Sequence, residues 1–147
     1  MDKENKLVPG LPSGFEDRWS NKLLLKKKLV KAIEKNFIKF GAEPLETPSF
    51  EISENIGSFL AEDDTNPMSD VFSFEDGEKN ITLRYDLSSP LARFVAQNNQ
   101  ELPSIFKRYQ IQNVFRNEKA GNGRYREFMQ ADFDIVGNVD PAQANAE

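Results

Sequence analysis

The fold is decided by the stretch Phe106-Lys-Arg-Tyr-Gln-Ile-Gln-Asn-Val-Phe-Arg-Asn-Glu-Lys-Ala-Gly-Asn-Gly-Arg-Tyr-Arg-Glu-Phe-Met-Gln-Ala-Asp-Phe-Asp-Ile-Val-Gly137. It predicts two strands joined by a loop that contains Gly121 and Gly123. In the first strand, Tyr109, Ile111, Asn113 and Phe115 alternate with Gln110, Gln112, Val114, Arg116 and Glu118. In the second strand, Met129, Ala131, Phe133 and Ile135 alternate with Phe128, Gln130, Asp132, Asp134 and Val136. A period of two is the signature of a half-buried strand.

The whole chain has 147 residues, which fits one ordinary domain with enough bulk to bury a core. The formal net charge is −5, but the charges are segregated. Residues 1–41 carry ten Lys and Arg against five Asp and Glu, residues 42–82 carry one against eleven, and residues 83–147 carry eight against eight. The basic first segment fits a surface that faces RNA, although a solvated lysine face on a helix is the simpler interpretation.

Cysteine and histidine are both absent. Their absence argues against a structural zinc site and excludes nucleophilic catalysis by either residue. No apolar run approaches the roughly 18 residues of a membrane span, and the N-terminus is polar and unlike a signal peptide. We therefore expect a cytoplasmic protein with no membrane partner.

Residues 1–16 contain two prolines and two glycines and are expected to form an irregular lead-in. A helix is expected next, from about Asp17 or Ser20 to Phe40, because apolar residues recur at helical spacings. The apolar stripe comprises Trp19, Leu23, Val30, Ile33, Phe37 and Phe40. Gly41 is placed to end the helix in the left-handed conformation. Such a helix most often packs on a core, and its length also suits a subunit interface.

Short strands are expected between this helix and the deciding stretch. Residues 43–51 contain two prolines, which limit them to an edge strand or an extended segment. Residues 54–70 are acidic and indicate a short helix that leads into a mobile loop. Residues 71–75 and 80–86 flank Asp76-Gly77, which is a strong hairpin signal.

A second helix is expected at Ser88–Asn98, with Ser89 as the N-cap and Pro90 at the first helical position. Its buried side is expected to comprise Leu91, Phe94 and Val95. Asp140-Pro141 is the start signal of a further helix. The order helix, hairpin, helix, hairpin predicts an α+β fold, in which an antiparallel sheet is flanked by helices and keeps one polar face open as a ligand cradle.

The polar face of the deciding stretch carries groups suited to an anionic ligand. Guanidinium binds phosphate or carboxylate bidentately, and three such groups surround the loop, at Arg116, Arg124 and Arg126. The Phe128 ring on this face is suited to stack on a base. Negative charge for a cationic group would come from Asp86, Asp132 and Asp134. From the residues alone, a solvent-exposed hairpin with weak surface ion pairs explains the pattern equally well.

At this stretch the sequence resembles a known family. Phe115-Arg-Asn-Glu118, a loop and Gly123-Arg-Tyr-Arg-Glu-Phe-Met-Gln-Ala-Asp-Phe-Asp134 resemble motif 2 of class II aminoacyl-tRNA synthetases, in the form of the histidyl-tRNA synthetase family. Leu83-Arg-Tyr-Asp-Leu-Ser-Ser-Pro-Leu-Ala-Arg93 resembles the histidine-contacting segment of that family. The long first helix and Pro48 resemble motif 1, the dimer-forming element. The resemblance places motif 1 at about 17–51, the histidine-contacting segment at about 83–93 and motif 2 at about 106–137, within an incomplete class II catalytic core that spans 17–147.

The resemblance implies ATP-dependent activation of L-histidine, its transfer to tRNA(His), and a homodimer formed through motif 1. Arg116 would be the catalytic arginine, which bridges the α-phosphate of ATP and the histidine carboxylate. Glu118 would hold the adenine edge or the loop, Arg124 would reach the distal phosphates, and Phe128 would stack on adenine. Mg²⁺ is expected to enter with ATP.

The resemblance also implies contacts with histidine. Asp86 and Ser88 would hold its α-ammonium group, Arg116 and Gln130 would contact its carboxylate, and Asp134 would accept a hydrogen bond from its imidazole. Asp86 and Asp134 stand where many family members have Glu, and Ser88 stands where Thr is usual. The hydrogen-bonding groups are kept in these changes.

Two more positions depart from the family pattern. Met129 stands where many members have His, and it is expected to face the packing side. Ala120 replaces a frequent loop proline. Together the departures resemble a divergent bacterial branch of the family.

Motif 3 and the anticodon-binding domain find no match in the chain, so the resemblance predicts a partial protein that is inactive alone. One alternative stays open, the synthetase-like regulatory subunit of ATP phosphoribosyltransferase, which shares the fold and much of motif 2. The segment 84–88, together with Glu118 and Asp134, favours the synthetase because the contacts to ATP and histidine are kept together. A scaffold without a ligand has the least support.

Overall fold

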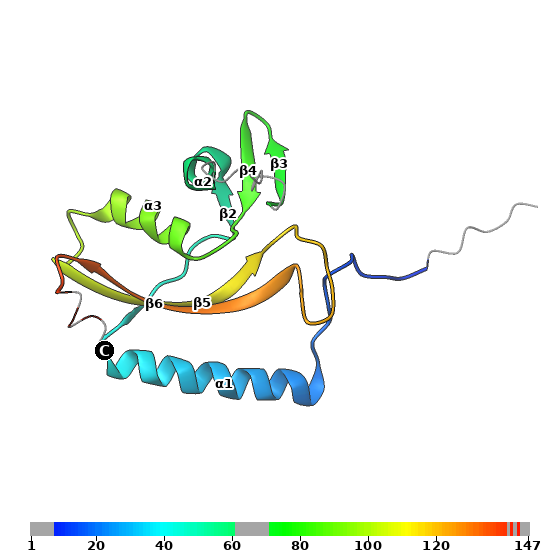
Figure 1. Ribbon diagram of the computed structural model, residues 1–147, viewed down its shortest axis with the longest axis horizontal. Helices are drawn as coiled ribbons and strands as arrows, with labels where there is room; N and C mark the ends of the chain where they lie inside the picture. The colour runs from blue at the N-terminus through cyan, green and yellow to red at the C-terminus, as the bar shows by residue number, and fades with distance from the viewer. Residues whose placement is uncertain (1–7, 61–70, 141, 143, 145–147) are drawn as a thin grey trace, which may run out of the picture.

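The computed structural model describes residues 8–60, 71–140, 142 and 144. Along this part of the chain the elements are α1 (Ser20–Lys39), β1 (Glu43–Pro44), β2 (Phe50–Ile52), α2 (Ser53–Leu60), β3 (Ser73–Asp76), β4 (Lys79–Leu83), α3 (Ser88–Asn98), β5 (Ile105–Phe115) and β6 (Glu127–Gly137). The strands form two sheets, with the orders β1-β5-β6 and β2-β4-β3 (Figure 1). The arrangement confirms the predicted α+β class.

The hairpin β5–β6 forms the centre of the structure. Its strands pair antiparallel over their full length, from Ile105 opposite Gly137 to Phe115 opposite Glu127. Because side chains alternate along a strand, the even-numbered residues of both strands share one face, the even face, and the odd-numbered residues share the other, the odd face. The predicted antiparallel pairing holds here, whereas β1 pairs with β5 in parallel, with Glu43 opposite Arg108.

Helix α1 covers the odd face of the hairpin and lies below it in Figure 1. The Phe37 ring packs against the rings of Tyr109 and Phe133, at centroid distances of 5.8 and 5.5 Å. The Tyr109 hydroxyl also donates a hydrogen bond to Glu34 Oε1 at 3.0 Å. Aromatic packing on one strip of α1 therefore fixes the helix to the sheet.

The prediction for α1 is correct at its C-terminal end and wrong at its N-terminal end for one residue of the apolar stripe. At the C-terminus, Gly41 has a φ of 76°, and the amides of Gly41 and Ala42 donate to the carbonyl oxygens of Ile38 and Phe37. This is a Schellman motif, and it confirms the predicted stop. The predicted stripe is wrong at Trp19, which precedes the helix with an extended backbone and is 78% exposed. The extended backbone takes its side chain off the helical repeat.

The rest of the stripe is confirmed in part. Leu23, Val30, Ile33 and Phe37 are half-buried, whereas Phe40 at the end of the helix is exposed although it contacts Phe133. The outer side of α1 keeps further apolar residues exposed, namely Leu24, Leu25, Leu29 and Ile38.

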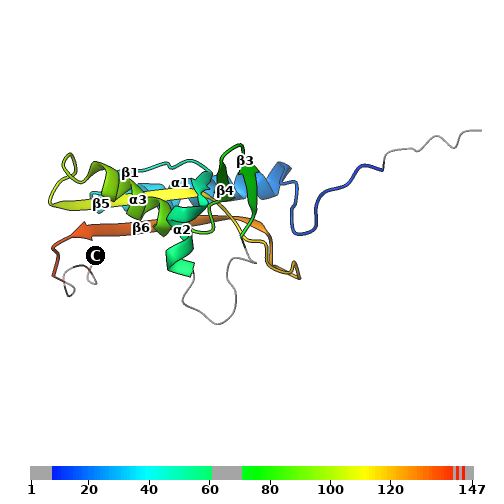
Figure 2. The ribbon, with the colours of Figure 1, turned by 90° about the horizontal axis from the view of Figure 1, so that it is seen from above.

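Helix α3 and the segment before it cover one end of the even face (Figures 1 and 2). The Phe94 ring packs on Phe106 at 6.2 Å, and Leu91 is buried. Leu87 and Arg108 are both 0% exposed. The expectation that the polar face stays open is therefore wrong at this end, because the chain returns over Arg108 and excludes solvent from it.

The N-terminus of α3 corrects a second prediction. The helix begins at Ser88, and Leu87 occupies the N-cap position without a side-chain hydrogen bond, so Ser89 is not the N-cap. The Asp86 carboxylate performs the capping instead. Its Oδ1 accepts a hydrogen bond from the Ser89 amide at 2.9 Å, and its Oδ2 accepts one from the Ser89 hydroxyl at 3.4 Å.

The smaller sheet confirms the predicted hairpin, since Asp76 pairs with Lys79 and Gly77 has a φ of 60°. The strands β1 and β2 each lie at the edge of a sheet, as the two prolines of residues 43–51 predict. The polar side chain of Arg84, which follows β4, is only 3% exposed. It donates to Thr47 O at 2.7 Å and to Asn113 O at 2.6 Å, and so joins the two sheets.

Some predictions fall partly outside the described residues. Residues 8–16 are irregular, as expected, and residues 1–7 lie outside. The predicted short helix is α2, whereas residues 61–70, where a mobile loop is predicted, lie outside. Asp140 Oδ1 accepts a hydrogen bond from the Ala142 amide at 2.8 Å, as expected where a helix starts, while residue 141 lies outside.

Candidate functional site

The loop between β5 and β6 is held in place by Arg126. The Arg126 amide donates to Gly14 O at 2.8 Å, and its Nε donates to Glu118 O at 2.8 Å. Its carbonyl oxygen accepts a hydrogen bond from the Arg116 amide at 2.9 Å. Gly14 lies so close to this side chain that an added Cβ would come within 2.7 Å of Arg126 Cγ. Among the three loop arginines, Arg126 therefore anchors the loop to the lead-in.

Arg116 lies between two aromatic rings. Its Cζ is 4.4 Å from the ring centroid of Tyr85 and 5.1 Å from that of Phe128. Its Nε donates to the carbonyl oxygen of Tyr85 at 3.4 Å. Stacking on aromatic faces fixes the plane of a guanidinium, and its N–H donors point outward in that plane, where they can meet an anion.

Arg124 and Glu118 form an ion pair in the same region. Arg124 Nη2 lies 2.8 Å from Glu118 Oε2, and the Arg124 side chain is 68% exposed. The Tyr85 hydroxyl donates to Glu118 Oε1 at 3.4 Å. Because exposed ion pairs contribute little stability, Arg124 can exchange the carboxylate for another anion at small cost.

These groups line one cavity of about 280 Å³ at the loop end of the even face, which we call the loop cavity. Its lining comprises Arg116, Glu118, Gly123, Arg124, Tyr125 and Phe128. All four residues that the resemblance assigns to ATP are in this set. Two guanidinium groups against one carboxylate give the loop cavity a positive charge, which suits a phosphorylated ligand.

Gln130 follows Phe128 on the even face and lies opposite Gln112. Its Oε1 is buried and has no hydrogen-bond partner within the described part of the chain. Buried polar atoms are nearly always paired in native proteins. Among the described residues, this orphaned acceptor makes Gln130 a candidate for contact with a ligand, next to the loop cavity.

Further along the same face, Asp134 forms an ion pair with Arg108, with 2.8 Å between Oδ2 and Nη2. Burial lowers the pKa of Arg108, and the carboxylates of Asp134 and Asp132 oppose that effect. Burial raises the pKa of Asp132, the charge of Arg108 lowers it, and the charges of Asp134 and Asp86 raise it. Two carboxylates thus lie near one guanidinium, a third, that of Asp86, acts on Asp132, and this excess of negative charge suits a cationic group.

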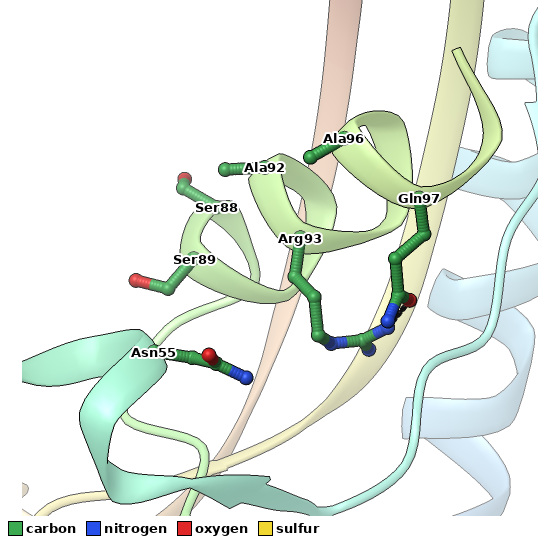
Figure 3. A pocket seen from close by; sticks show the side chains of 7 residues that line it. All are labelled: Asn55, Ser88, Ser89, Ala92, Arg93, Ala96 and Gln97. Carbon is green, nitrogen blue, oxygen red and sulfur yellow. Dashed lines mark hydrogen bonds between the residues drawn. The ribbon is translucent and has the colours of Figure 1, made fainter. Parts of the chain in front are cut away.

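Ser88 lies at the exposed start of α3 and borders, with Val136 of β6, a cavity of about 490 Å³. It also borders a cavity of about 690 Å³ between α2 and α3, which is lined by Asn55, Ser88, Ser89, Ala92, Arg93, Ala96 and Gln97. Figure 3 shows Ser88, Ala92 and Ala96 along one side of α3, with Asn55 facing the helix from α2. Arg93 is occupied by two hydrogen bonds to the Glu51 carboxylate, at 2.7 and 2.8 Å.

The structure therefore joins most of the predicted site residues in two groups on one face of the hairpin. Arg116, Glu118, Arg124 and Phe128 line the loop cavity, Gln130 follows, and Asp134 and Asp86 lie near Arg108 and Asp132. Met129, on the odd face, borders α1, as predicted.

Sequence reasoning missed Tyr85, Arg84 and Arg108. The run Arg108, Gln110, Gln112 was a usable signal for the last of these, since it places three polar groups on one face of a strand. Strand β5 lies between β1 and β6, and central strands are often covered on both faces. Polar residues in such a strand are buried and must find partners.

Two absences concern residues 8–60, 71–140, 142 and 144 only. In this part of the chain, no group of three or more His, Cys, Asp or Glu residues is arranged to hold a metal ion. None of the helices described there is long and apolar enough to span a membrane.

Comparison with known sequences gives a consistent set of relatives. Residues 14–147 match the family model described as Histidyl-tRNA synthetase. The chain is 80% identical over 147 residues to a histidine–tRNA ligase of Pelagibacter ubique, of which it covers 32%. It is 45% identical over 146 residues to a histidine–tRNA ligase of Rhodopseudomonas palustris, with 99% of this chain and 28% of that protein covered. The chain thus spans about a third of the length of the curated relatives it matches.

Solved structures show the same fold. The histidyl-tRNA synthetase from Nostoc sp. PCC 7120 matches with a TM-score of 0.74 and 30% identity, over 93% of this chain and 32% of that one. A Bacillus halodurans protein described as an ATP phosphoribosyltransferase regulatory subunit/histidyl-tRNA synthetase matches with a TM-score of 0.79 and 22% identity, over 99% and 36% of the two chains. At 22% identity, the second match concerns the fold alone.

Proposed function

The chain belongs to the histidyl-tRNA synthetase family, and we propose that it forms the ATP- and histidine-binding part of a histidine–tRNA ligase. The observation that carries this proposal is the loop cavity, where the four residues assigned to ATP meet. Gln130 and Asp134, which are assigned to histidine, continue along the same face of β6. Nucleotide and amino acid would therefore lie end to end along one strand.

The reaction joins two anions. A carboxylate oxygen of histidine attacks the α-phosphorus of ATP, a new P–O bond forms, and the bond to the β-phosphate breaks to release pyrophosphate. The histidyl group then passes from the adenylate to a ribose hydroxyl of tRNA(His), and AMP leaves. Because the reactants repel each other, fixed positive charge and exact alignment supply much of the catalysis in the first step.

Arg116 is the proposed catalytic residue for this step. Its guanidinium is already held between Tyr85 and Phe128, so little reorganisation is needed when charge develops on the α-phosphate. From this position it would contact both the phosphate and the histidine carboxylate. Mg²⁺ is proposed to enter with ATP, as the partner of the phosphates.

The other nucleotide contacts come from the loop cavity. Arg124 would leave Glu118 and pair with the distal phosphates, which carry more charge than one carboxylate. Glu118, which also accepts a hydrogen bond from Tyr85, would hold the adenine edge or the loop. Phe128 would stack on adenine, on the ring surface that Arg116 does not cover.

The histidine contacts come from the opposite direction along the face. Gln130 lies between the loop cavity and Asp134 on the same face, and its Nε2 would donate to the histidine carboxylate. Its Oε1, which has no partner within the described residues, is an acceptor and would suit an N–H group of the substrate. Asp134 would accept a hydrogen bond from the imidazole. Asp86 and Ser88 would hold the α-ammonium group, since a carboxylate can accept more hydrogen bonds than the ones it receives from Ser89.

The wider assignments belong to the same proposal. Residues of about 17–51 would be motif 1, about 83–93 the histidine-contacting segment and about 106–137 motif 2. The exposed Leu24, Leu25 and Leu29 on the outer side of α1 suit the proposed homodimer. A cytoplasmic location and the partner tRNA(His) are proposed because protein synthesis requires them.

The test is histidine-dependent ATP–pyrophosphate exchange by the product of the complete gene that contains this sequence. Wild type should exchange, and Arg116→Ala should lower kcat by about 10²- to 10³-fold, as when one transition-state contact is removed. Arg18→Ala is the matched control, because Arg18 also lies over a tyrosine ring, that of Tyr125, at 5.8 Å. Tyr125 lines the loop cavity, but Arg18 itself does not. Its exchange rate should remain within about threefold of wild type.

Two results would count against the proposal. Normal exchange by Arg116→Ala would remove Arg116 from the catalytic role. No exchange by wild type, together with activation of an ATP phosphoribosyltransferase catalytic subunit, would replace the ligase by the regulatory subunit.

A further inference from the structure

Arg108 connects the two segments to which the proposed function assigns histidine. It is the largest of the fully buried side chains within the described residues. Its Nη2 lies 2.8 Å from Asp134 Oδ2 on β6 and donates to the carbonyl oxygen of Leu87 at 3.2 Å. Leu87 stands between Asp86 and Ser88 in the chain. A single guanidinium therefore contacts the proposed imidazole acceptor and the segment that carries both proposed ammonium contacts.

Arg108 is itself held by a buried polar chain. Its Nη1 donates to Gln110 Oε1 at 3.0 Å. Gln110 Nε2 donates to Thr47 Oγ1 at 2.8 Å and to Gln112 Oε1 at 2.6 Å. Gln110 and Leu87 are, like Arg108, 0% exposed. Because Gln110 and Leu87 are fully buried, their contacts hold the guanidinium in one position beside Asp134.

The charge balance shows what the loss of this guanidinium would do. The charge of Asp132 interacts with those of Asp134 and Asp86, and the charge of Arg108 offsets this repulsion. Without Arg108, no described cation is ion-paired with Asp134. The carboxylate would then be free to turn toward solvent, because its side chain is 34% exposed. This change would move the acceptor away from the imidazole.

We propose that Arg108 is a positioning residue for histidine, which fixes Asp134 as a charged acceptor and fixes the turn at Asp86–Ser88 without touching the amino acid. The inference rests on the proposed function, because it needs histidine to bind between these segments. It adds a determinant of histidine affinity and selectivity that lies beneath the site.

The test compares Arg108 with another buried arginine in the exchange assay. In Arg108→Met the KM for histidine should rise by about tenfold or more, while the KM for ATP stays within about twofold, since the loop cavity lies at the other end of the hairpin. Arg108→Lys should show a smaller rise. A lysine keeps the charge near Asp134 but cannot contact Gln110 and Leu87 together.

Arg84→Met is the matched control. Arg84 is 3% exposed, and burial lowers its pKa as it does for Arg108. Its hydrogen bonds go to the carbonyl oxygens of Thr47, Pro48 and Asn113 and to Gln112 Oε1, and none of these residues is assigned to histidine. This variant should lower the Tm, and the KM for histidine should rise less than in Arg108→Met, because the hydrogen bonds of Arg84 do not go to Asp134 or Leu87.

The outcomes separate the two proposals. Exchange by wild type with an unchanged KM for histidine in Arg108→Lys and Arg108→Met overturns the role of Arg108 and leaves the ligase intact. An equal rise of both KM values in the Arg108 variants, matched by Arg84→Met, also overturns it, since that pattern reports general damage. If Arg108→Met does not fold, Arg108→Lys decides alone by the ratio of the two KM values. No exchange by wild type would remove the proposed function and this inference together.

Discussion

The odd and even faces of the β5–β6 hairpin are made by the same two strands but are packed in different ways. On the odd face, the Phe37 ring of α1 lies against the rings of Tyr109 and Phe133. On the even face, the fully buried residues include Arg108 and Gln110, whose polar atoms are bonded to one another, to Thr47 and to Leu87. The odd face is thus covered by an aromatic contact, whereas the even face buries a polar network beside the contact of Phe94 with Phe106.

The difference has an energetic meaning. Burial of apolar surface stabilises a fold by about 25 cal/mol per Å². Buried hydrogen bonds and ion pairs contribute little net stability but fix orientation, because any other arrangement leaves a polar group unpaired. We therefore expect the odd face to carry the stability of the hairpin and the even face to carry its chemistry. Substitutions on the two faces should separate these properties.

The largest effect is expected on stability, from Phe37→Ala. This change removes the ring that contacts both Tyr109 and Phe133 and should lower the free energy of unfolding by about 3 kcal/mol. Urea denaturation followed by circular dichroism measures the loss. Lys35→Ala, at an exposed position on the same helix, should change it by no more than about 0.5 kcal/mol. Equal losses in the two variants would mean that the aromatic contact does not hold α1 on the sheet.

The next largest effect on stability is expected for Gln112, which lies opposite Gln130 on the even face. Gln112 Oε1 accepts hydrogen bonds from Arg84, Gln110 and the Thr47 amide. The Oε1 of the opposite residue, Gln130, accepts none from the described part of the chain. Gln112→Leu should lower the free energy of unfolding by about 1–3 kcal/mol, because buried donors lose their acceptor. Gln130→Leu should leave stability unchanged or raised.

Within this pair, the substitution that costs less stability, Gln130→Leu, should cost more activity. Gln130→Leu should lower kcat/KM for histidine in the exchange assay by about tenfold, the equivalent of one lost hydrogen bond to a charged group. A Gln130→Leu protein that is destabilised as much as Gln112→Leu, yet still active, would show that Gln130 is structural. Gln130 and Gln112 would then both serve stability, and the division between stability and activity within this face would not hold.

The alternation of residues predicted the two faces of the hairpin, and the family resemblance named four of the six residues that line the loop cavity. Both signals come from residues that are near one another in the chain. Neither signal predicted the burial of Arg108, which depends on a carbonyl at Leu87, 21 residues earlier in the chain. Charged residues are normally assigned to solvent, and no local pattern shows that another segment covers them. Ser89 was predicted as the helix cap from its position next to Pro90. In the structure the Asp86 carboxylate caps the helix instead, by accepting a hydrogen bond from the Ser89 amide.

The smallest effect tests whether a buried carboxylate on the even face lowers the stability of the fold. Burial raises the pKa of Asp132 in the folded protein above its ordinary value, and the positive charge of Arg108 offsets this only in part. The folded state therefore binds the proton of Asp132 more tightly than the unfolded state does. Stability from this group is fully present below the unfolded pKa of about 4 and is lost as the pH rises through the higher folded pKa. At pH 7 the ionised carboxylate thus destabilises the fold.

Asp132→Asn removes that charge and should raise the free energy of unfolding at pH 7, by less than about 1 kcal/mol because solvent screens a partly exposed carboxylate. The gain should shrink toward zero as the pH falls to about 4, where wild type is increasingly protonated. Urea midpoints of both proteins at pH 7, 5.5 and 4 measure this trend. A variant that is less stable at pH 7, or a gain that grows as the pH falls, would show that Arg108 more than compensates the burial of Asp132. The negative cluster would then be a stabilising ion-pair network, and the even face would differ from the odd face in chemistry but not in its contribution to the fold.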